Sequence, residues 1–288
     1  MATLKDFRND VRPNWCPGCG DYAVQAAIQR SLGSLNLEPE QVAIISGIGC
    51  SGRISGYFNT FGFHTIHGRS LPVAQGVKLA NRDLTVIAAG GDGDGFGIGL
   101  GHFMHAARRN MNITYVVMDN QIYGLTKGQH SPTSAFGFKA KTTPAGNIEN
   151  AISPLQIALA AGVTYLAQGF SHDVNQLTEL ITKGIQHKGF SLINVFSPCV
   201  TYNKVNTYEW YKEHVVPLDQ FPDYDPTDKT SAAAKVIATD GLCTGLIYID
   251  NDRPAFDELI PGYLETPIAQ QDFHINQDQF DKFMAEFA

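Results

Sequence analysis

Short runs of consecutive apolar residues recur through the first two thirds of the chain, and most of them end in a glycine-rich or polar turn. Five runs have the length of buried β-strands: Val42–Ser46, Leu84–Gly90, Ile113–Met118, Val163–Leu166 and Ser191–Val195. Strands that are apolar on both faces, rather than on alternate residues, are typical of a parallel sheet covered on both sides.

Segments with helical spacing of apolar residues lie between these strands. They are Tyr22–Leu32, Val73–Asn81, Gly97–Arg109, Pro154–Ala161 and His172–His187. Alternating strands and helices predict an α/β fold, a parallel sheet with helices on both faces. Ligands of such sheets bind beyond the carboxyl ends of the strands, so the turns that follow strands are the places to search for a site.

The pattern weakens after Cys199. Residues 201–226 are rich in aromatic residues, proline and aspartate. The regular segments beyond them are a helix at Ala232–Thr239, a strand at Thr244–Ile249 and an amphipathic piece at Asp278–Phe287. We predict one α/β domain over residues 1–200, with residues 201–288 as a C-terminal extension packed on it. The aromatic residues between Tyr202 and Tyr211 are expected to serve packing or a subunit interface.

Composition narrows the class of protein. The chain has 288 residues, 43% of them hydrophobic, and a net charge of −7 from 21 basic and 28 acidic residues. A mildly acidic surface argues against nucleic acid and anionic membranes as partners, because both require a cationic face. No signal peptide or transmembrane run is visible, so we expect a cytoplasmic protein. Five cysteines in that compartment are more typical of metal ligands, catalytic groups or core residues than of disulfides.

The predicted strand Leu84–Gly90 leads into the turn Gly91-Asp92-Gly93-Asp94-Gly95. Glycines allow backbone N–H groups to face a phosphate, and the following helix N-terminus favours negative charge. The turn departs from the dinucleotide-binding pattern and from the P-loop, so glycine content alone is weak evidence. Two aspartates would repel a bare diphosphate, but they suit a diphosphate bound through a divalent cation.

The next strand, Ile113–Met118, ends close to Asn120. Parallel neighbours would bring Asp92 and Asn120 to the same edge of the sheet. Mg²⁺ binds six oxygens, and the Asp92 carboxylate, the Asn120 amide oxygen and the Ile122 carbonyl could supply three of them beside diphosphate oxygens and water. The simpler alternative is two glycine-rich turns of an ordinary α/β domain.

The Gly91-Asp92-Gly93 turn, followed at the end of the next strand by Asn120, resembles the signature of the thiamine-diphosphate superfamily. The resemblance implies that Asp92, Asn120 and the backbone oxygen of Ile122 are Mg²⁺ ligands. The residues that it suggests for cofactor binding are Gly91, Asp92, Gly93, Asp94, Asn120, Ile122, Tyr123, Gly124, Leu125, His67, Cys50 and Ser51.

Four cysteines are expected at the same edge. Cys16 and Cys19 form a short chelating pair, and Cys50 and Cys199 each follow a predicted strand. Four thiolates there would bind zinc or a 4Fe–4S cluster, and spacing alone leaves both open. Next to thiamine diphosphate, a 4Fe–4S cluster is favoured over zinc, because the cofactor forms a carbanion that can lose electrons one at a time. Cys243 has no partner motif and is expected to be a buried core residue.

Together these motifs resemble the beta subunit of the 2-oxoacid:ferredoxin oxidoreductases over residues 12–215. The segments that carry the resemblance are Trp15-Cys16-Pro17-Gly18-Cys19-Gly20-Asp21, Gly47-Ile48-Gly49-Cys50-Ser51, His67-Gly68-Arg69-Ser70-Leu71-Pro72, Gly90–Gly93 and Tyr123-Gly124-Leu125-Thr126-Lys127-Gly128-Gln129. The resemblance implies that residues 1–200 hold thiamine diphosphate, Mg²⁺ and a 4Fe–4S cluster. Its cluster ligands would be Cys16, Cys19, Cys50 and Cys199.

The implied reaction converts a 2-oxoacid and coenzyme A into acyl-CoA and CO₂ and reduces ferredoxin. The resemblance favours 2-oxoglutarate as the substrate, with pyruvate as the second candidate. Arg53 and Lys127 are the candidates for binding the substrate carboxylate. No glutamate stands in a motif suited to activate the cofactor, so the resemblance implies a heterodimer whose larger alpha subunit supplies one.

Two other functions fit parts of the sequence. A non-redox thiamine-diphosphate decarboxylase subunit would keep Asp92 and Asn120 but need no cluster, and the four cysteines argue against it. A zinc-stabilised α/β interaction module would use the cysteines but leave the glycine turns without a chemical role. Iron and acid-labile sulfide would distinguish the redox enzyme from both.

Overall fold

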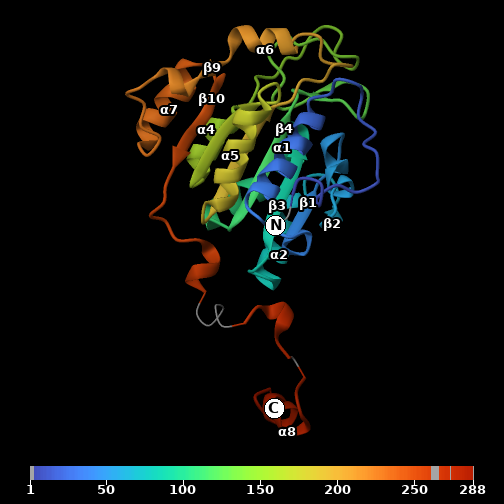
Figure 1. Cartoon of the computed structure of the whole chain (residues 1–288), viewed down its shortest axis with the longest axis vertical. Coiled ribbons are helices and arrows are strands. Elements are labelled where there is room, and N and C mark those ends of the chain that lie inside the picture. Colours follow the sequence, from blue (N-terminus) through green and yellow to red (C-terminus); the bar gives the residue numbers. More distant parts are fainter. Residues whose placement is uncertain (1–2, 261–265, 273, 288) are drawn as a thin grey trace.

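The computed structural model describes residues 3–260, 266–272 and 274–287. Its centre is an eight-stranded sheet in the order β2-β1-β3-β4-β8-β7-β10-β9 (Figure 1). The strands are β1 (Val42–Ser46), β2 (Phe61–His64), β3 (Thr85–Gly91), β4 (Ile113–Asp119), β7 (Tyr165–Phe170), β8 (Phe190–Phe196), β9 (Val216–Pro217) and β10 (Cys243–Ile249). All pairings from β2 to β7 are parallel, whereas β10 runs antiparallel to β7. The predicted α/β class is confirmed.

Helices cover both faces of this sheet, as the apolar strands predicted. The helices are α1 (Asp21–Ser34), α2 (Ser70–Ala80), α3 (Leu100–Arg109), α4 (Pro154–Ala161), α5 (Val174–Gln186), α6 (Tyr208–His214), α7 (Lys229–Ala238) and α8 (Gln277–Ala285). Val42 and Ile44 of β1 pack with α1 and α5, whereas Ala43 and Ile45 belong to the core beneath α2, α3, α4 and α7. Successive strand residues point to opposite faces, so one apolar strand supplies two cores.

Most predicted strands lie within a few residues of the observed ones, and β1 has the predicted bounds. The strand predicted at Val163–Leu166 was placed too early, because β7 continues through Gln168 and Gly169. The buried Gln168 side chain donates through Nε2 to the carbonyls of Gly241 and Cys243, both at 2.7 Å, and its Oε1 accepts from Asn194 Nδ2 at 2.8 Å. The edge strand β2 was not predicted, since it has only four residues, all of them exposed, and is not a continuous apolar run like the other strands.

The helix predicted at Gly97–Arg109 is wrong in its first turn. A π-helical segment, η3 (Gly93–Ile98), follows the Asp92 turn, and the α-helix α3 begins only at Leu100. The break is at Gly97, whose ψ of −110° is not helical. Two short helical pieces therefore connect β3 to β4, and the first of them starts inside the glycine-rich turn.

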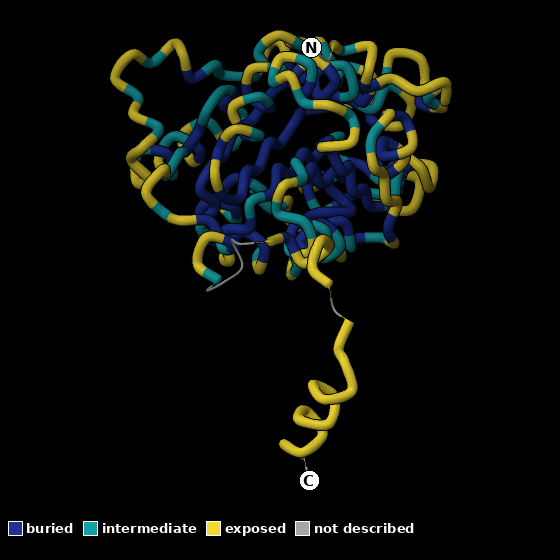
Figure 2. Tube along the Cα trace, turned by 60° about the horizontal axis from the view of Figure 1, so that its bottom comes forward, coloured by how far each residue is buried: buried dark blue, intermediate teal, exposed yellow. Residues whose placement is uncertain are grey.

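The predicted C-terminal helix and strand correspond to α7 and β10, and β10 joins the main sheet beside β7. Cys243, at the start of β10, is fully buried in the core, as predicted. Helix α8 has no buried residue and lies apart from the sheet in Figure 2. No helix in the described part of the chain is long and apolar enough to cross a membrane. The division of the chain at residue 200 stays a prediction.

Candidate functional site

The turns that follow β3 and β4 lie next to each other. In the parallel register Gly91 is paired with Met118, so both strands reach the same edge of the sheet together. The backbone N–H of Asn120 faces the Asp92 carboxylate at 3.4 Å. The prediction that Asp92 and Asn120 lie at one edge is confirmed.

Asp92 is a buried carboxylate, 1% exposed. Burial raises its pKa, and hydrogen bonds from neighbouring hydroxyl groups oppose that effect. Thr133 donates to Asp92 Oδ2 at 2.7 Å and also lies 3.1 Å from Asp119 Oδ1. No Lys, Arg or His pairs with Asp92 in the part of the chain that the structure describes. A buried carboxylate without a cationic partner suits a bound divalent ion.

The second turn supplies two more oxygens. The Asn120 side-chain oxygen accepts from the Ile122 backbone N–H at 3.1 Å, which closes the turn into the short strand β5 (Ile122–Tyr123). Asp92, Asn120 and Ile122 line one pocket, to which they could offer a carboxylate oxygen, an amide oxygen and a backbone carbonyl. Three oxygen donors of this kind fit Mg²⁺, which prefers hard oxygen ligands and keeps several waters or phosphate oxygens.

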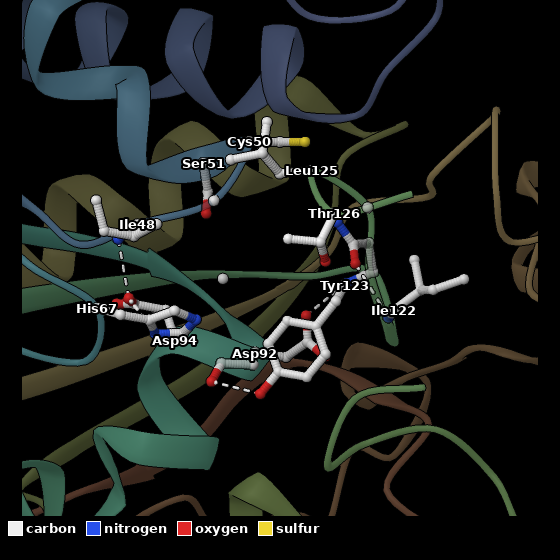
Figure 3. A pocket seen from close by; sticks show the side chains of 15 residues that line it. Ile48, Cys50, Ser51, His67, Asp92, Asp94, Ile122, Tyr123, Leu125 and Thr126 are labelled. Atoms are coloured by element: carbon white, nitrogen blue, oxygen red, sulfur yellow. Dashed lines mark hydrogen bonds and ion pairs between the residues drawn. The ribbon is translucent and has the colours of Figure 1, made fainter. Parts of the chain in front are cut away.

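This pocket, which we call the cofactor pocket, also brings together the other predicted contacts (Figure 3). All twelve residues suggested for cofactor binding line it: Gly91, Asp92, Gly93, Asp94, Asn120, Ile122, Tyr123, Gly124, Leu125, His67, Cys50 and Ser51. Ile48, Gly49 and Thr126 line it as well and were not predicted. Their common location is an observation, and their binding of a cofactor stays a prediction.

The middle glycine of the turn is required by close packing. A Cβ at Gly93 would lie 2.2 Å from Cε1 of Tyr123, and the Tyr123 hydroxyl donates to the Gly93 carbonyl at 3.1 Å. A side chain at position 93 would therefore displace the aromatic ring that forms one wall of the cofactor pocket.

A third carboxylate at this edge was not predicted. Asp119 is 2% exposed, and burial together with the neighbouring Asp92 raises its pKa to about 7. Asn194 donates to Asp119 Oδ2 at 3.3 Å. Asp119 does not line the cofactor pocket and faces a separate cavity together with Asn194 and Gln168.

The four predicted cysteines meet at a second pocket, which we call the cysteine pocket. Cys16, Cys19, Cys50 and Cys199 all line it, and all are free thiols. A Cβ at Gly124 would lie 3.6 Å from Cys199 Sγ and 3.7 Å from Cys50 Sγ, so both sulfurs face the space left by this glycine. Thiolates from three distant segments around one pocket have the donor chemistry of a metal–sulfur site.

The groups that raise the pKa of Cys50 include two other cysteines of the set, which agrees with their location around one pocket. Burial, together with the nearby Asp21, Cys199 and Cys16, raises the pKa of Cys50 to about 12. Asp21 is fully buried, accepts from Ser197 Oγ at 2.7 Å and has its pKa raised by burial to about 6.

No three His, Cys, Asp or Glu side chains of the described residues surround a point suited to a single metal ion.

The two pockets share a wall. Ile48, Gly49, Cys50, Asn120, Gly124 and Leu125 line both of them. Cys50 is thus the one cysteine among the described residues that lines both pockets.

The two cationic candidates are placed differently. Arg53 lies in the 3₁₀ segment after Cys50, is exposed and lines the cysteine pocket together with His64. Lys127 is exposed in the loop after Leu125 and lines neither pocket. In the aromatic group Tyr211 is buried and stacks on Phe196 at 4.5 Å, which is a packing role, whereas Tyr202 lies at the cysteine pocket.

Two models of known protein families match successive parts of the chain. Residues 47–195 match the model of the thiamine pyrophosphate enzyme C-terminal TPP-binding domain. Residues 199–265 match the model of the C-terminal region of the pyruvate ferredoxin oxidoreductase beta subunit.

Curated relatives cover nearly the whole chain. The chain is 41% identical to 2-oxoacid:ferredoxin oxidoreductase 2, subunit beta, of Aeropyrum pernix, over 96% of this chain and 94% of that protein. It is 36% identical to 2-oxoglutarate synthase subunit KorB of Methanocaldococcus jannaschii, over 91% of this chain and 97% of that protein. A solved structure of 2-oxoglutarate:ferredoxin oxidoreductase from Magnetococcus marinus, with 2-oxoglutarate, coenzyme A and succinyl-CoA bound, superposes with a TM-score of 0.85 at 43% identity, covering 88% of this chain and 87% of that one.

Proposed function

The chain belongs to the family of 2-oxoacid:ferredoxin oxidoreductase beta subunits, and we propose that it holds thiamine diphosphate and a 4Fe–4S cluster in adjoining pockets. In this proposal the complex converts a 2-oxoacid and coenzyme A into acyl-CoA and CO₂. That conversion releases two electrons and one proton, and the electrons reduce ferredoxin. The observation that carries the proposal is the wall that the cofactor pocket and the cysteine pocket share at Cys50.

In the cofactor pocket, Asp92, Asn120 and the Ile122 carbonyl would hold Mg²⁺, and through it the diphosphate. Bound thiamine diphosphate supplies the carbanion chemistry that makes loss of CO₂ from a 2-oxoacid feasible. Gly93 lets Tyr123 close the pocket wall, and the buried Thr133 orients the Asp92 carboxylate. This chain's part in the reaction is to fix the position of the cofactor and keep its surroundings dry.

In the cysteine pocket, Cys16, Cys19, Cys50 and Cys199 would be the cluster ligands. A 4Fe–4S cluster supplies a one-electron acceptor between a two-electron oxidation and ferredoxin. The thiols would bind as thiolates, so the half-buried Cys19 and Cys50, whose pKa values are raised in the free chain, would lose their protons as the iron binds.

We favour 2-oxoglutarate as the substrate. The relatives named for 2-oxoglutarate and the structure of the Magnetococcus marinus enzyme with 2-oxoglutarate support this choice. Arg53, which lines the cysteine pocket beside Cys50, is our candidate for binding a substrate carboxylate.

Arg53→Ala is expected to raise the KM for 2-oxoglutarate by about 10- to 100-fold, because the carboxylate would lose its cationic partner. Arg53→Lys should recover part of the loss, while Lys127→Ala should change KM by less than Arg53→Ala because Lys127 lines neither pocket. Steady-state kinetics of the anaerobic complex would measure all three. A larger effect at Lys127 would move the assignment to that residue.

The partner is a larger alpha subunit, which we propose supplies the glutamate that activates the cofactor. The carboxylates lining the cofactor pocket are both aspartates, Asp92 and Asp94, among the described residues. Asp92 is assigned to Mg²⁺, and Oδ1 of Asp94 accepts from two backbone N–H groups, which fixes this carboxylate against the loops at Ile48 and Gly68.

The isolated chain is therefore expected to bind thiamine diphosphate weakly but to show no oxidation of a 2-oxoacid. Adding the alpha subunit should restore coenzyme A-dependent ferredoxin reduction. Anaerobic assays with the single chain and with the reconstituted complex would measure this. Robust activity of the isolated chain would show that an activating carboxylate lies within it.

A further inference from the structure

Two aspartates flank Gly93, and they face different partners. Asp92 lies at the Asn120 turn, whereas Asp94, which is 2% exposed, contacts the loops at Ile48 and Gly68. Asp94 Oδ1 accepts from the backbone N–H of Ile48 at 2.9 Å and from that of Gly68 at 2.7 Å. His67 Nδ1 lies 3.1 Å from the same oxygen. Figure 3 shows the Ile48 bond and the His67 ring beside this carboxylate.

These partners belong to two loops that form the walls of the site. Ile48 is 46 residues away from Asp94 along the chain, and Gly68 is 26 residues away. The first loop leads directly to Cys50, and Ile48 and Cys50 line both the cofactor pocket and the cysteine pocket. The second loop places His67 in the cofactor pocket. One carboxylate thus joins three separate segments.

The space around this carboxylate is closely fitted. A Cβ at Gly47 would lie 1.9 Å from Asp94 Oδ2, and the three atoms nearest to it all belong to Asp94. A Cβ at Gly90 would lie 2.8 Å from the same oxygen. The carboxylate therefore occupies a slot that depends on the absence of side chains at positions 47 and 90.

We propose that Asp94 is a positioning residue that fixes the Cys50 loop and the His67 loop to the cofactor turn. Through it, the position of the cofactor and the position of one cluster ligand are set by the same carboxylate. The inference rests on the proposed function and extends it, because it predicts that a single residue outside the cysteine set affects both centres.

A direct role at the cofactor is the competing explanation, since Asp94 also lines the cofactor pocket. A residue that contacts only the cofactor or its Mg²⁺ would change thiamine diphosphate binding and leave the cluster as it is. A positioning residue would change both, because loss of the bond to Ile48 releases the backbone two residues before Cys50.

The test compares Asp94→Ala with Asp94→Asn in the anaerobic two-subunit complex. Alanine leaves two backbone N–H groups without their acceptor, so we expect thiamine diphosphate binding to weaken about tenfold. The electron paramagnetic resonance g-values of the reduced cluster should shift in the same variant, with loss of part of the iron. Asparagine keeps an oxygen that can accept both N–H groups, so both measurements should stay close to those of the parent.

Gly47→Ala provides a second test that keeps the carboxylate. The added methyl must displace Asp94, so this variant should reproduce both defects. In the double variant Gly47→Ala/Asp94→Ala the collision is gone, and the combined loss should be smaller than the product of the two single losses. If Asp94→Ala alone yields little complex, Gly47→Ala still tests the proposal, because it keeps the carboxylate, and normal thiamine diphosphate binding together with normal g-values in this variant would overturn the positioning role.

The outcomes separate this inference from the proposed function. Parent complex that holds neither iron nor thiamine diphosphate would defeat the proposed function itself. If the parent complex holds both centres, two results would overturn the positioning role. One is an Asp94→Ala variant that is normal in both centres, and the other is an Asp94→Ala variant that is defective in thiamine diphosphate binding alone.

Discussion

Asp92→Ala is expected to weaken Mg²⁺-dependent thiamine diphosphate binding by more than about 100-fold, a loss at least as large as that for residues that only support a metal ligand. The carboxylate is the one charged oxygen among the three proposed Mg²⁺ ligands, and the ion tolerates few departures from six oxygens. Equilibrium binding of thiamine diphosphate, titrated at low and at saturating Mg²⁺, measures the effect. Binding that remains close to that of the parent at both concentrations would remove Asp92 from the site.

The fold should survive this change. Asp92 is buried without a cationic partner among the described residues, so alanine removes a desolvated carboxylate rather than breaking an ion pair. Thr133 loses one acceptor but retains Asp119 Oδ1 at 3.1 Å. We expect the Tm of the free chain to change by no more than about 4 °C.

Two companion variants sharpen the result. Asn120→Ala should also abolish tight binding, but it removes the acceptor for the Ile122 N–H as well, so its effect mixes metal binding with turn structure. Asp119→Asn is the matched control, because Asp119 is a buried carboxylate at the same edge that does not line the cofactor pocket. Its affinity for thiamine diphosphate should stay within a few-fold of the parent value.

The sequence contains enough information to predict the two strand–turn junctions that build this site. Continuous apolar strands are recognisable, and polar residues that follow them at parallel neighbours must meet at one edge. This rule alone places Asp92 and Asn120, which follow β3 and β4, at one edge of the sheet. It also places Cys50, which follows β1, and Cys199, which follows β8, at that edge. The close approach of all twelve suggested residues follows from the family resemblance, which supplied the loop residues.

The residues that sequence reasoning missed come from segments without a periodic pattern. Thr133 reaches Asp92 from a loop between β6 (Gln129–His130) and α4, and nothing in its local sequence indicates where that loop returns to the sheet. The same holds for the second role of Asp94, which depends on two backbone N–H groups far away along the chain. Polar contacts of this kind are fixed by tertiary structure and leave no local pattern.

The predicted start of the helix at Gly97 was wrong for a related reason. Glycines of the turn continue into a π-helical segment, and the resulting break at Gly97 is incompatible with one regular helix. Such π-helical pieces are frequent at functional sites, where they position groups that a regular helix would not. Apolar periodicity predicts the helix body of α3 but not where it begins.

Replacing any one of Cys16, Cys19, Cys50 or Cys199 by serine is expected to cause loss of most of the iron and of ferredoxin reduction. A serine hydroxyl is a much poorer iron ligand than a thiolate, so a cluster held by three cysteines would be labile. Release of CO₂ from the 2-oxoacid should persist at a low rate, since it depends on the cofactor pocket. Iron content, acid-labile sulfide and ferredoxin reduction are measured anaerobically on the complex with the alpha subunit.

Cys243→Ser is the matched control for this series. Cys243 is fully buried in the core at the start of β10, away from both pockets, so its replacement should reduce stability by about 1 kcal/mol and leave iron unchanged. Loss of iron in this variant would mean that the assays report unfolding rather than ligand loss.

Among the four, Cys16 gives the cleanest evidence and Cys50 the most ambiguous. Cys50 lines both pockets, so its replacement can disturb the cofactor directly, whereas Cys16 is exposed and lines only the cysteine pocket. A Cys16→Ser complex should therefore bind thiamine diphosphate like the parent and yet fail to reduce ferredoxin. Full iron and full ferredoxin reduction in this variant would refute the ligand assignment, and zinc in place of iron in anaerobically purified parent complex would refute the redox function altogether.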